Sequence, residues 1–431
     1  MPEGLSYTWK TKMLGTICQL SGGYGFPDSL QGSIEGELPF IKVSDMSLSR
    51  NERDIVNANN YVSIRIADSM GWKPFPAGAV VFAKVGAALK LNRRRILIRP
   101  TLIDNNMMVA IPYGGLDSAF LYHFLCAIDF GDFVQDGALP SVNQEQIGSI
   151  KIPDINKDEQ HRIAEILDTI DDAIQKTEAL ISKLKAMKQG LLHDLLTRGL
   201  DENGKLRDPK AHPEQFKEWA LGRVPINWEV NRLGKFLARI DQGWSPDCDS
   251  DPAPQGEWGV LKTTAVVWEG YRDNKNKRLP RAHKPIPFYE VRVDDVLMTR
   301  GGPNSRVGVV ALVHKTQGRL MLSDKIYRLV HNDDVSPAFL TYALSGNRTQ
   351  RHLSSFKTGM AESQTNISQE IVRSLFITVP PKQEQYIIVK TLAKYGARIR
   401  AEERYRDKLK LQKKGLIQDL LTGKVRVKVD M

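Results

Sequence analysis

The sequence is poor in cysteine and has no long apolar run. Cys18, Cys126 and Cys248 are the only cysteines in 431 residues, too few and too far apart for a disulfide framework or a zinc knuckle. No apolar run approaches the roughly 20 residues that span a bilayer, and the first residues lack the charged-then-apolar layout of a signal peptide. These absences predict a protein of the reducing cytosol without membrane contact.

The usual catalytic and cofactor patterns are also missing. Gly199-x4-Gly204-Lys205 departs from a phosphate-binding loop because Leu206 stands where Ser or Thr is required, so we interpret it as a turn. The eight histidines form no H-x3-H or H-E-x-x-H cluster. The sequence therefore predicts no catalytic residue, no metal site and no cofactor in this chain.

The composition is that of a folded globular protein with a basic balance. Hydrophobic residues make up 41% and charged residues 26%, and the length is sufficient for two or three domains. The formal net charge of +11 makes a polyanion a plausible partner. Residues 381–431 alone carry 14 Lys and Arg against 6 Asp and Glu, so the net charge does not identify a binding surface elsewhere.

One segment of the chain occurs twice. Residues 157–197 and 382–422 align without a gap, and 17 of the 41 positions are identical. Shorter anchors in front of each copy also match, such as Trp9 with Trp228, while the residues between the anchors differ widely. The layout is therefore variable domain, repeated segment, variable domain, repeated segment.

Both copies predict a long helix with an apolar stripe at alternating steps of four and three, the coiled-coil pattern. At 1.5 Å per residue, each helix would be about 60 Å long. The stripe consists of Ile163, Leu167, Ile170, Ile174, Ile181, Leu184 and Leu191 in the first copy, and of Ile388, Leu392, Tyr395, Ile399, Leu409 and Leu416 in the second.

We expect the two stripes to pair in an antiparallel orientation. Residues 157–172 are rich in acids and residues 408–424 are rich in lysine, and antiparallel packing brings these ends together. The alternative is that each stripe faces its own globular domain. Gly190 and Gly415, at equivalent points, indicate either a close backbone approach or hinge, or glycines tolerated near a helix end.

The predicted fold class is α+β, with two globular domains separated by two long antiparallel coiled-coil helices in a pseudo-twofold internal repeat. The variable regions contain β-branched runs broken by Gly and Pro, with helical patches at 116–130 and 337–344. The predicted segments are a first domain at 1–155, a first helix at 156–198, a linker at 199–225, a second domain at 226–380, and a second helix with a tail at 381–431.

Two similar but different domains on matched helices imitate a symmetric dimer, and dimeric DNA readers set half-site spacing by the separation of their domains. The chain resembles the specificity subunit of type I restriction–modification systems over essentially its full length. The resemblance rests on Leu139-Pro140-Ser141-Val142-Asn143 before Glu159-Gln160-x-x-Ile163, on Asn366-Ile367-Ser368 before Pro380-Pro381-x-x-Glu384-Gln385-x-x-Ile388, and on the helix endings at 188–197 and 413–424.

The resemblance implies two target recognition domains, each reading one half of an asymmetric, interrupted site in double-stranded DNA. It also implies that the paired helices set the spacer and dock two methyltransferase (modification) subunits, and that motor–nuclease (restriction) subunits complete the complex. S-adenosylmethionine, ATP and magnesium would then be bound by those partners, with none in this chain. The protein would be no enzyme by itself and would be cytoplasmic, in association with the nucleoid.

Arg, Lys, Asn and Gln side chains read base edges, and Lys, Arg, Ser and Thr also bind phosphates. The candidates lie mainly in three groups of loops in each domain: the loop after an apolar strand, the loop before the long helix, and a glycine-rich turn. In the first domain they are Tyr24, Lys42, Lys84, Lys90, Asn92, Arg93, Arg94 and Gln135. In the second they are Trp244, Lys262, Arg300, Asn304, Ser305, Arg306, Lys357, Ser363, Gln364 and Thr365.

Two other functions stay open at this point. A stand-alone metal-dependent nuclease could use Asp247, Asp273 and Lys275, and it would cut DNA without partners. A coiled-coil scaffold would have no DNA role and would show no sequence preference in binding, but it leaves the divergent twin domains unexplained.

Overall fold

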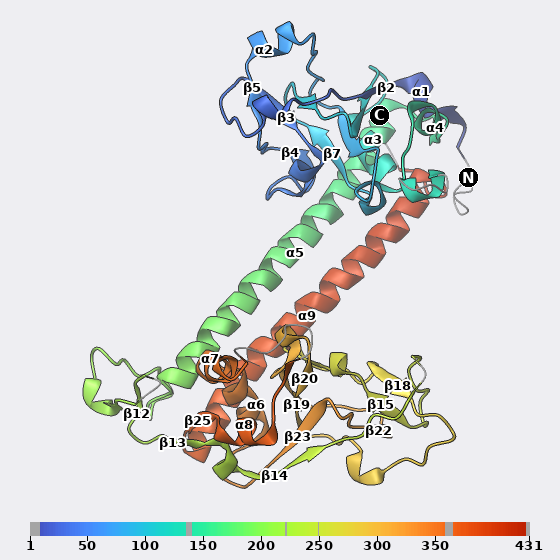
Figure 1. The fold of residues 1–431 in the computed structure, drawn as a ribbon. Helices are drawn as coiled ribbons and strands as arrows, with labels where there is room; N and C mark the ends of the chain where they lie inside the picture. The colour runs from blue at the N-terminus through green and yellow to red at the C-terminus, as the bar shows by residue number, and fades with distance from the viewer. Residues whose placement is uncertain (1–8, 135–139, 220–221, 249, 358–364, 428–431) are drawn as a thin grey trace. The chain divides into compact units, whose positions relative to one another are not determined.

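The computed structural model describes residues 9–134, 140–219, 222–248, 250–357 and 365–427. The chain forms two compact units: unit 1 is Met1–Ala179 with Glu403–Met431, and unit 2 is Leu180–Glu402. The borders fall inside the two long helices, α5 (Lys157–Thr197) and α9 (Lys382–Leu421), so each unit contains part of both helices (Figure 1). None of the helices in the described ranges has the length and apolar character that a bilayer span requires.

Unit 1 is built on a five-stranded sheet in the order β2-β9-β6-β7-β4, which is antiparallel except for the pair β4–β7. Helix α3 packs against this sheet, because Phe120 and Phe124 share a core with Val80 and Phe82. A second sheet has the order β5-β3-β8. The elements are β1 (Thr11–Met13), α1 (Leu14–Ile17), β2 (Cys18–Gly22), β3 (Leu38–Ile41), β4 (Asp54–Ile55), β5 (Tyr61–Val62), α2 (Ile64–Ser69), β6 (Val80–Ala83), β7 (Arg94–Leu97), β8 (Leu102–Ile103), β9 (Met107–Pro112), α3 (Ser118–Cys126), α4 (Gln144–Gly148) and β10 (Lys151–Pro153).

Unit 2 repeats this plan. Its main sheet has the order β14-β23-β19-β21, the counterpart of β2-β9-β6-β7, and a second sheet has the order β18-β15-β22. The elements are β11 (Phe216–Lys217), β12 (Val224–Pro225), β13 (Glu229–Arg232), β14 (Leu237–Gln242), β15 (Gly259–Leu261), β16 (Val266–Val267), β17 (Gly270–Tyr271), β18 (Asn276–Arg278), β19 (Val296–Thr299), β20 (Gly301–Gly302), β21 (Val310–Leu312), β22 (Leu320–Met321), β23 (Ile326–His331), α6 (Pro337–Ser345), α7 (Asn347–Ser355), β24 (Thr365–Asn366), α8 (Gln369–Ser374) and β25 (Phe376–Val379).

The structure confirms the predicted α+β class with two globular parts and two long helices. The helical patches predicted from the sequence correspond to α3 and α6. Residues 199–225, predicted as a linker, belong to unit 2 and contain the antiparallel pair β11–β12. They pack against the rest of that unit, where the ring centre of Trp219 lies 4.9 Å from that of Phe376. The phosphate-loop look-alike within it is a turn, since Gly204 donates its N–H to the carbonyl of Asp201 (3.0 Å).

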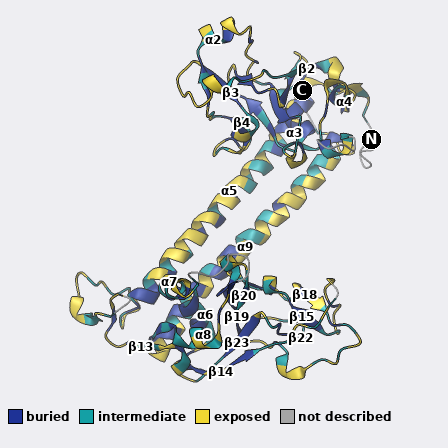
Figure 2. Cartoon of the chain, in the orientation of Figure 1, coloured by how far each residue is buried: buried dark blue, intermediate teal, exposed yellow. Residues whose placement is uncertain are grey.

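The apolar stripes of α5 and α9 are buried or half-buried along their length, while the other faces of both helices are largely exposed (Figure 2). In unit 1, Ile163 and Leu167 share a core with Leu420 of α9 and with residues of the sheet. In unit 2, Leu195 shares a core with Ile388 of α9. The stripes therefore pair with each other, as expected. At the helix ends they also pack into the globular core, which is the alternative that the sequence left open.

Ion pairs show that the helices are antiparallel. In unit 1, Lys413 lies 2.6 Å from Asp171, and Lys410 lies 2.6 Å from Glu178. The residue numbers of the partners therefore fall along α9 as they rise along α5. The predicted attraction between the acidic and basic ends is therefore confirmed. A Cβ on Gly190 or Gly415 would meet no atom within 4 Å, so the interpretation of these glycines as points of close backbone approach is wrong.

The repeated Gln of the Glu-Gln motif anchors the first turn of each long helix to the globular part of the same unit. Gln160 accepts a hydrogen bond from the N–H of Asp117 (2.8 Å) and donates to the carbonyl of Gly115 (3.1 Å). Gln385 accepts from the N–H of Ser336 (3.0 Å) and donates to the carbonyl of Asp334 (2.9 Å). Asp117 and Ser336 are the N-caps of α3 and α6, so the same amide ties a long helix to the first turn of a domain helix in both units.

The Glu of the same motif binds an arginine in each unit, through a single carboxylate near the start of each long helix. In unit 2, Glu384 accepts hydrogen bonds from the N–H of Leu200 (2.7 Å), Arg207 (2.8 Å) and the indole of Trp228 (3.1 Å), which we call the Glu384 clasp.

In unit 1, the Glu159 clasp consists of Trp9, Glu159 and Arg426. The guanidinium of Arg426 donates to both oxygens of Glu159 (2.8 and 2.9 Å) and lies 4.2 Å from the ring centre of Trp9. Each clasp therefore joins the start of one long helix to residues that follow the end of the other.

Candidate nucleic-acid interface

In each unit, two of the candidate loops form one continuous surface. In unit 1, Gly86 donates its N–H to the carbonyl of Pro140 (2.7 Å), and Val142 donates to the carbonyl of Lys84 (2.9 Å). In unit 2, the short strands β20 and β24 pair antiparallel. The loop after the inner strand β6 or β19 is therefore hydrogen-bonded to the segment that leads to the long helix.

The glycine-rich turns make close backbone contacts beside these loops. Gly23 follows β2, and a Cβ on it would lie 2.2 Å from the carbonyl oxygen of Asp104. Gly243 follows β14, and a Cβ on it would lie 1.9 Å from the carbonyl oxygen of Leu322. Only glycine fits at either position. These close contacts with the backbone hold the turns that carry the next residue, Tyr24 or Trp244.

Further contacts link the turns to the loops. A Cβ on Gly22 would lie 3.1 Å from the ammonium nitrogen of Lys84, so this side chain lies close to the turn. In unit 2, Arg300 donates to the carbonyl of Asp324 (3.2 Å), whose N–H donates to the hydroxyl of Ser245 (3.2 Å). All three groups of candidate loops thus converge in each unit. We call them loop surface 1 (residues 22–24, 84–94 and 140–142) and loop surface 2 (residues 243–245, 300–306 and 365–367).

In loop surface 1, Lys90 is exposed and Lys84 is half-buried. Asn92 has a left-handed backbone (φ 50°), and its side-chain oxygen accepts the N–H of Phe130 (3.0 Å). Arg93 donates to the hydroxyl of Ser47. Asn92 and Arg93 are thus held by the protein, and Lys90 faces solvent.

Arg94 is placed differently from the other candidates, because it is buried (1% exposed). Its guanidinium lies 3.7 Å from the ring centre of Phe130 and donates to the carbonyl of Ile128 (2.9 Å). Burial lowers the pKa of Arg94 to about 10. The side chain supports the loop from inside the unit and presents no donor on the surface.

In loop surface 2, Ser305 is exposed, and Asn304 and Arg306 are half-buried. Arg306 donates to the carbonyl of Thr263 (3.0 Å). This contact is equivalent to the one in unit 1 between Arg93 and Ser47. Arg300 lies 5.4 Å from the ring centre of Tyr327. Lys357 lies outside this surface and donates to the carbonyls of Asn304 and Val307, while Thr365 pairs with Gly302 in the β20–β24 ladder.

The remaining candidates lie at equivalent places or outside the described residues. Lys42 and Lys262 are the N-caps of matching 3-10 turns at Val43–Ser47 and Thr263–Ala265; Lys42 donates to Gln31 (2.9 Å), and Lys262 donates to the carbonyl of Ser250 (2.8 Å). The hydroxyl of Tyr24 contacts the backbone of Lys73, and Trp244 packs against His283. Gln135, Ser363 and Gln364 lie outside the described residues.

Within the described ranges, no group of three His, Cys, Asp or Glu residues is placed to hold a metal ion. Residues 7–186 and 262–411 match the family described as the type I restriction modification DNA specificity domain. The chain belongs to this family.

Individual members of the family are similar over parts of the chain. A type I restriction enzyme EcoEI specificity subunit of Escherichia coli is 44% identical over 195 residues, which is 45% of this chain and 33% of that protein. A putative type I restriction enzyme MjaX specificity subunit of Methanocaldococcus jannaschii is 27% identical over 300 residues, 67% of this chain and 62% of that protein. The matches therefore span less than two thirds of these relatives.

The fold is also that of a solved structure in the family. The S subunit of a type I restriction–modification system from M. genitalium is 13% identical and superposes with a TM-score of 0.56, over 98% of both chains. At a sequence identity this low, the structural similarity establishes the fold alone. None of the comparisons favours the nuclease or the scaffold alternative.

Sequence reasoning missed Gly23 and Gly243, whose backbone contacts fix the turns of both loop surfaces. A signal was present, because each glycine stands directly before an aromatic residue, Tyr24 or Trp244, at matching places of the repeat. It also missed that the loops belong to one surface, since the pairing of Lys84 with Val142 joins residues far apart in the sequence.

Arg94 and Lys90 should respond in opposite ways to loss of their charge. We expect Arg94→Met to destabilise unit 1 by about 1–3 kcal/mol, because the carbonyl of Ile128 loses a buried donor. Lys90→Met should leave stability within about 0.5 kcal/mol and weaken DNA binding at low salt, with a smaller salt dependence. Urea unfolding and DNA binding at several salt concentrations measure both; equal effects of the two changes on DNA affinity would contradict the assignment.

Proposed function

We propose that this chain is the non-catalytic specificity subunit of a type I restriction–modification complex, in which each unit reads one half of an asymmetric, interrupted site in double-stranded DNA. One observation carries the proposal: two units with the same strand order bring equivalent loops together, yet those loops present different side chains. Lys90 is exposed on one surface and Ser305 on the other. Different donors at equivalent places suit two different half-sites.

The helices and partners follow from the same proposal. The antiparallel pair of α5 and α9 sets the spacer between half-sites and docks two methyltransferase subunits, and motor–nuclease subunits join to restrict DNA. S-adenosylmethionine, ATP and magnesium are bound by those partners, and the complex works on DNA in the nucleoid. The residues proposed to face DNA directly are Lys84, Lys90, Asn304 and Ser305; Arg94 is left out because it is buried.

A methylation map tests the function. The chain would be co-expressed with its neighbouring methyltransferase gene in a host without adenine methylation, and modified bases would be located by long-read sequencing. We expect an asymmetric, interrupted motif with one modified adenine on each strand, in opposite halves. A continuous palindrome, or no methylation despite a purified complex of the two proteins, would contradict the proposal.

A further inference from the structure

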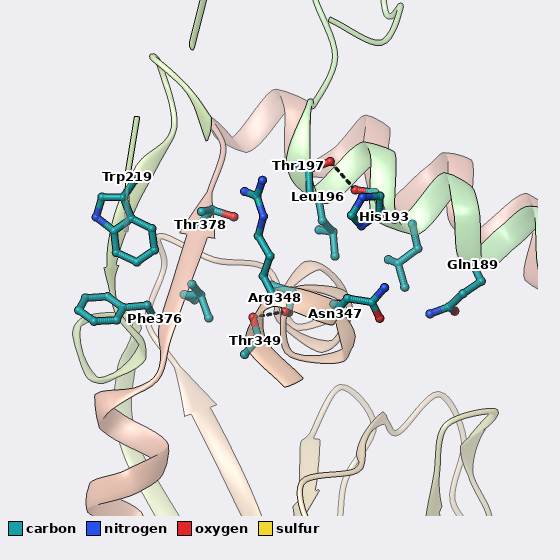
Figure 3. Close-up of a pocket in the computed structure, with 14 residues that line it drawn as sticks. Gln189, His193, Leu196, Thr197, Trp219, Asn347, Arg348, Thr349, Phe376 and Thr378 are labelled. Atoms are coloured by element: carbon teal, nitrogen blue, oxygen red, sulfur yellow. Dashed lines mark hydrogen bonds between the residues drawn. The ribbon is translucent and has the colours of Figure 1, made fainter. Parts of the chain in front are cut away.

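Unit 2 contains a pocket away from loop surface 2. It is lined by the last turns of α5, the corner between α6 and α7, strand β25 and Trp219 (Figure 3). Its wall is partly apolar: Leu192, Leu196, Ala343 and Ile377 line it together with Trp219 and Phe376, whose rings form an edge-to-face pair. The rest of the lining is polar and includes Thr197, Thr349 and Thr378.

One guanidinium nitrogen in the pocket finds no partner among the described residues: it belongs to Arg348, a half-buried side chain. The Nη1 of Arg348 is buried and has no hydrogen-bond acceptor, and no ion pair of Arg348 occurs among the described residues. Of the described residues that line the pocket, none is Asp or Glu. Burial lowers the pKa of Arg348 without any compensating carboxylate. A buried donor that finds no acceptor costs free energy, so a native structure that keeps one calls for an explanation.

Other arginines that keep a buried nitrogen without an acceptor among the described residues, such as Arg94 at its Nε, still donate from another guanidinium nitrogen. In the same unit, Arg207 binds Glu384 (2.8 Å), and Arg328 binds Asp241 (2.8 Å). In unit 1, Arg94 donates to a carbonyl. Arg348 therefore departs from the pattern of its own protein, and it does so in a pocket that opens to solvent past Gln189, His193 and Asn347, all exposed at the rim.

We infer that this pocket binds an acidic side chain next to an apolar one, presented by the methyltransferase partner. The carboxylate would accept from Arg348, and the apolar group would pack against Trp219, Phe376 and Leu192. The identity of the partner rests on the proposed function; the chemistry of the bound group rests on the pocket.

Charge complementarity and wall chemistry select a protein over DNA. A phosphate would satisfy Arg348, but a DNA backbone brings no apolar group for the Trp219–Phe376 wall. Buried Arg and Trp residues are the side chains that most often dominate protein–protein binding. An acidic residue beside an aliphatic or aromatic one supplies both contacts.

Arg348→Met tests the inference, with Arg351→Met as the matched control. Both arginines lie on α7, but Arg351 is exposed and outside the pocket. The affinity of each purified full-length variant for the methyltransferase subunit would be measured by titration calorimetry. We expect about 30-fold or greater weakening for Arg348→Met and less than about twofold change for Arg351→Met.

Thermal unfolding separates binding from a structural role. Removing a half-buried charge that has no counter-charge relieves its partial desolvation, so the Tm of Arg348→Met alone should stay level or rise. Unchanged affinity of Arg348→Met would overturn the inference and leave the proposed function standing. If the wild-type chain itself does not bind the methyltransferase subunit, both fall.

A second measurement does not depend on the stability of a charge variant. A photo-crosslinking phenylalanine analogue replaces His193 at the rim, and the complex with the methyltransferase subunit and DNA is irradiated. We expect a crosslinked methyltransferase peptide that contains Asp or Glu beside an apolar residue. A crosslink to DNA, or none in a complex that still methylates, would overturn the inference.

Discussion

Replacing Gly243 with alanine is expected to abolish reading of one half-site and to leave the other intact. The new Cβ would lie 1.9 Å from the carbonyl oxygen and 2.2 Å from the carbonyl carbon of Leu322. Both atoms are backbone, so the turn before Trp244 must move out of loop surface 2. Because each lost base-pair contact costs about 1–3 kcal/mol, the assembled complex should bind its site at least about tenfold more weakly.

The half-site effect can be measured on two DNAs. Scrambling the half-site that unit 2 is proposed to read should weaken the wild-type complex strongly and the Gly243→Ala complex little further. Gly23→Ala, whose Cβ would lie 2.2 Å from the carbonyl of Asp104, should show the same behaviour with the other half-site. Gly25→Ala is the control, because a Cβ there meets nothing within 4 Å. Wild-type affinity of Gly243→Ala would contradict the role of loop surface 2.

Glu384→Gln is expected to give the largest loss of stability, about 3–5 kcal/mol for unit 2. Glu384 is 7% exposed and Arg207 keeps only 10% of its side chain exposed, so the change leaves a buried guanidinium without its counter-charge. The N–H of Leu200 would then donate to a neutral amide oxygen, which is a weaker acceptor than the carboxylate of Glu384. Urea unfolding followed by tryptophan fluorescence, with hydrogen exchange of the Leu200 amide, measures the loss.

Glu159→Gln is the matched control, since Glu159 occupies the same place in the repeat. Its partner Arg426 has 66% of its side chain exposed, so water can solvate the guanidinium once the carboxylate is gone. The loss should therefore be clearly smaller than for Glu384→Gln. Adding Arg207→Met to Glu384→Gln should recover part of the stability, and equal losses in the two single variants would contradict this account.

The long helices could be predicted because their signal is local and repeated. The stripe through Ile163, Leu167, Ile388 and Leu392 follows from spacing alone, and all four side chains are fully buried. The orientation followed from charge, and the pair Lys413–Asp171 bears it out. The sequence left two interpretations of Gly190 open, because it does not show whether a helix position faces a neighbour or open space.

The candidate site was predictable as a set of loops but not as a surface. The contact of Gly86 with Pro140 depends on pairing between distant segments, which no local pattern encodes. Arg94 was counted with its neighbours Asn92 and Arg93 because arginine is usually exposed. Its burial is due to Phe130, which covers it from another part of the chain. Local sequence thus predicts donor types, and the tertiary fold decides which donors face solvent.

The division of the chain into units sets an order of completion during synthesis. Unit 2 is one continuous stretch, Leu180–Glu402, whereas unit 1 needs residues from 403 onward. A domain folds as a unit once its residues have left the ribosome. Unit 1, whose first residues are synthesised before unit 2, therefore completes its folding only after unit 2 has been synthesised. Arg426, the partner of Glu159, is among the last residues that it gains.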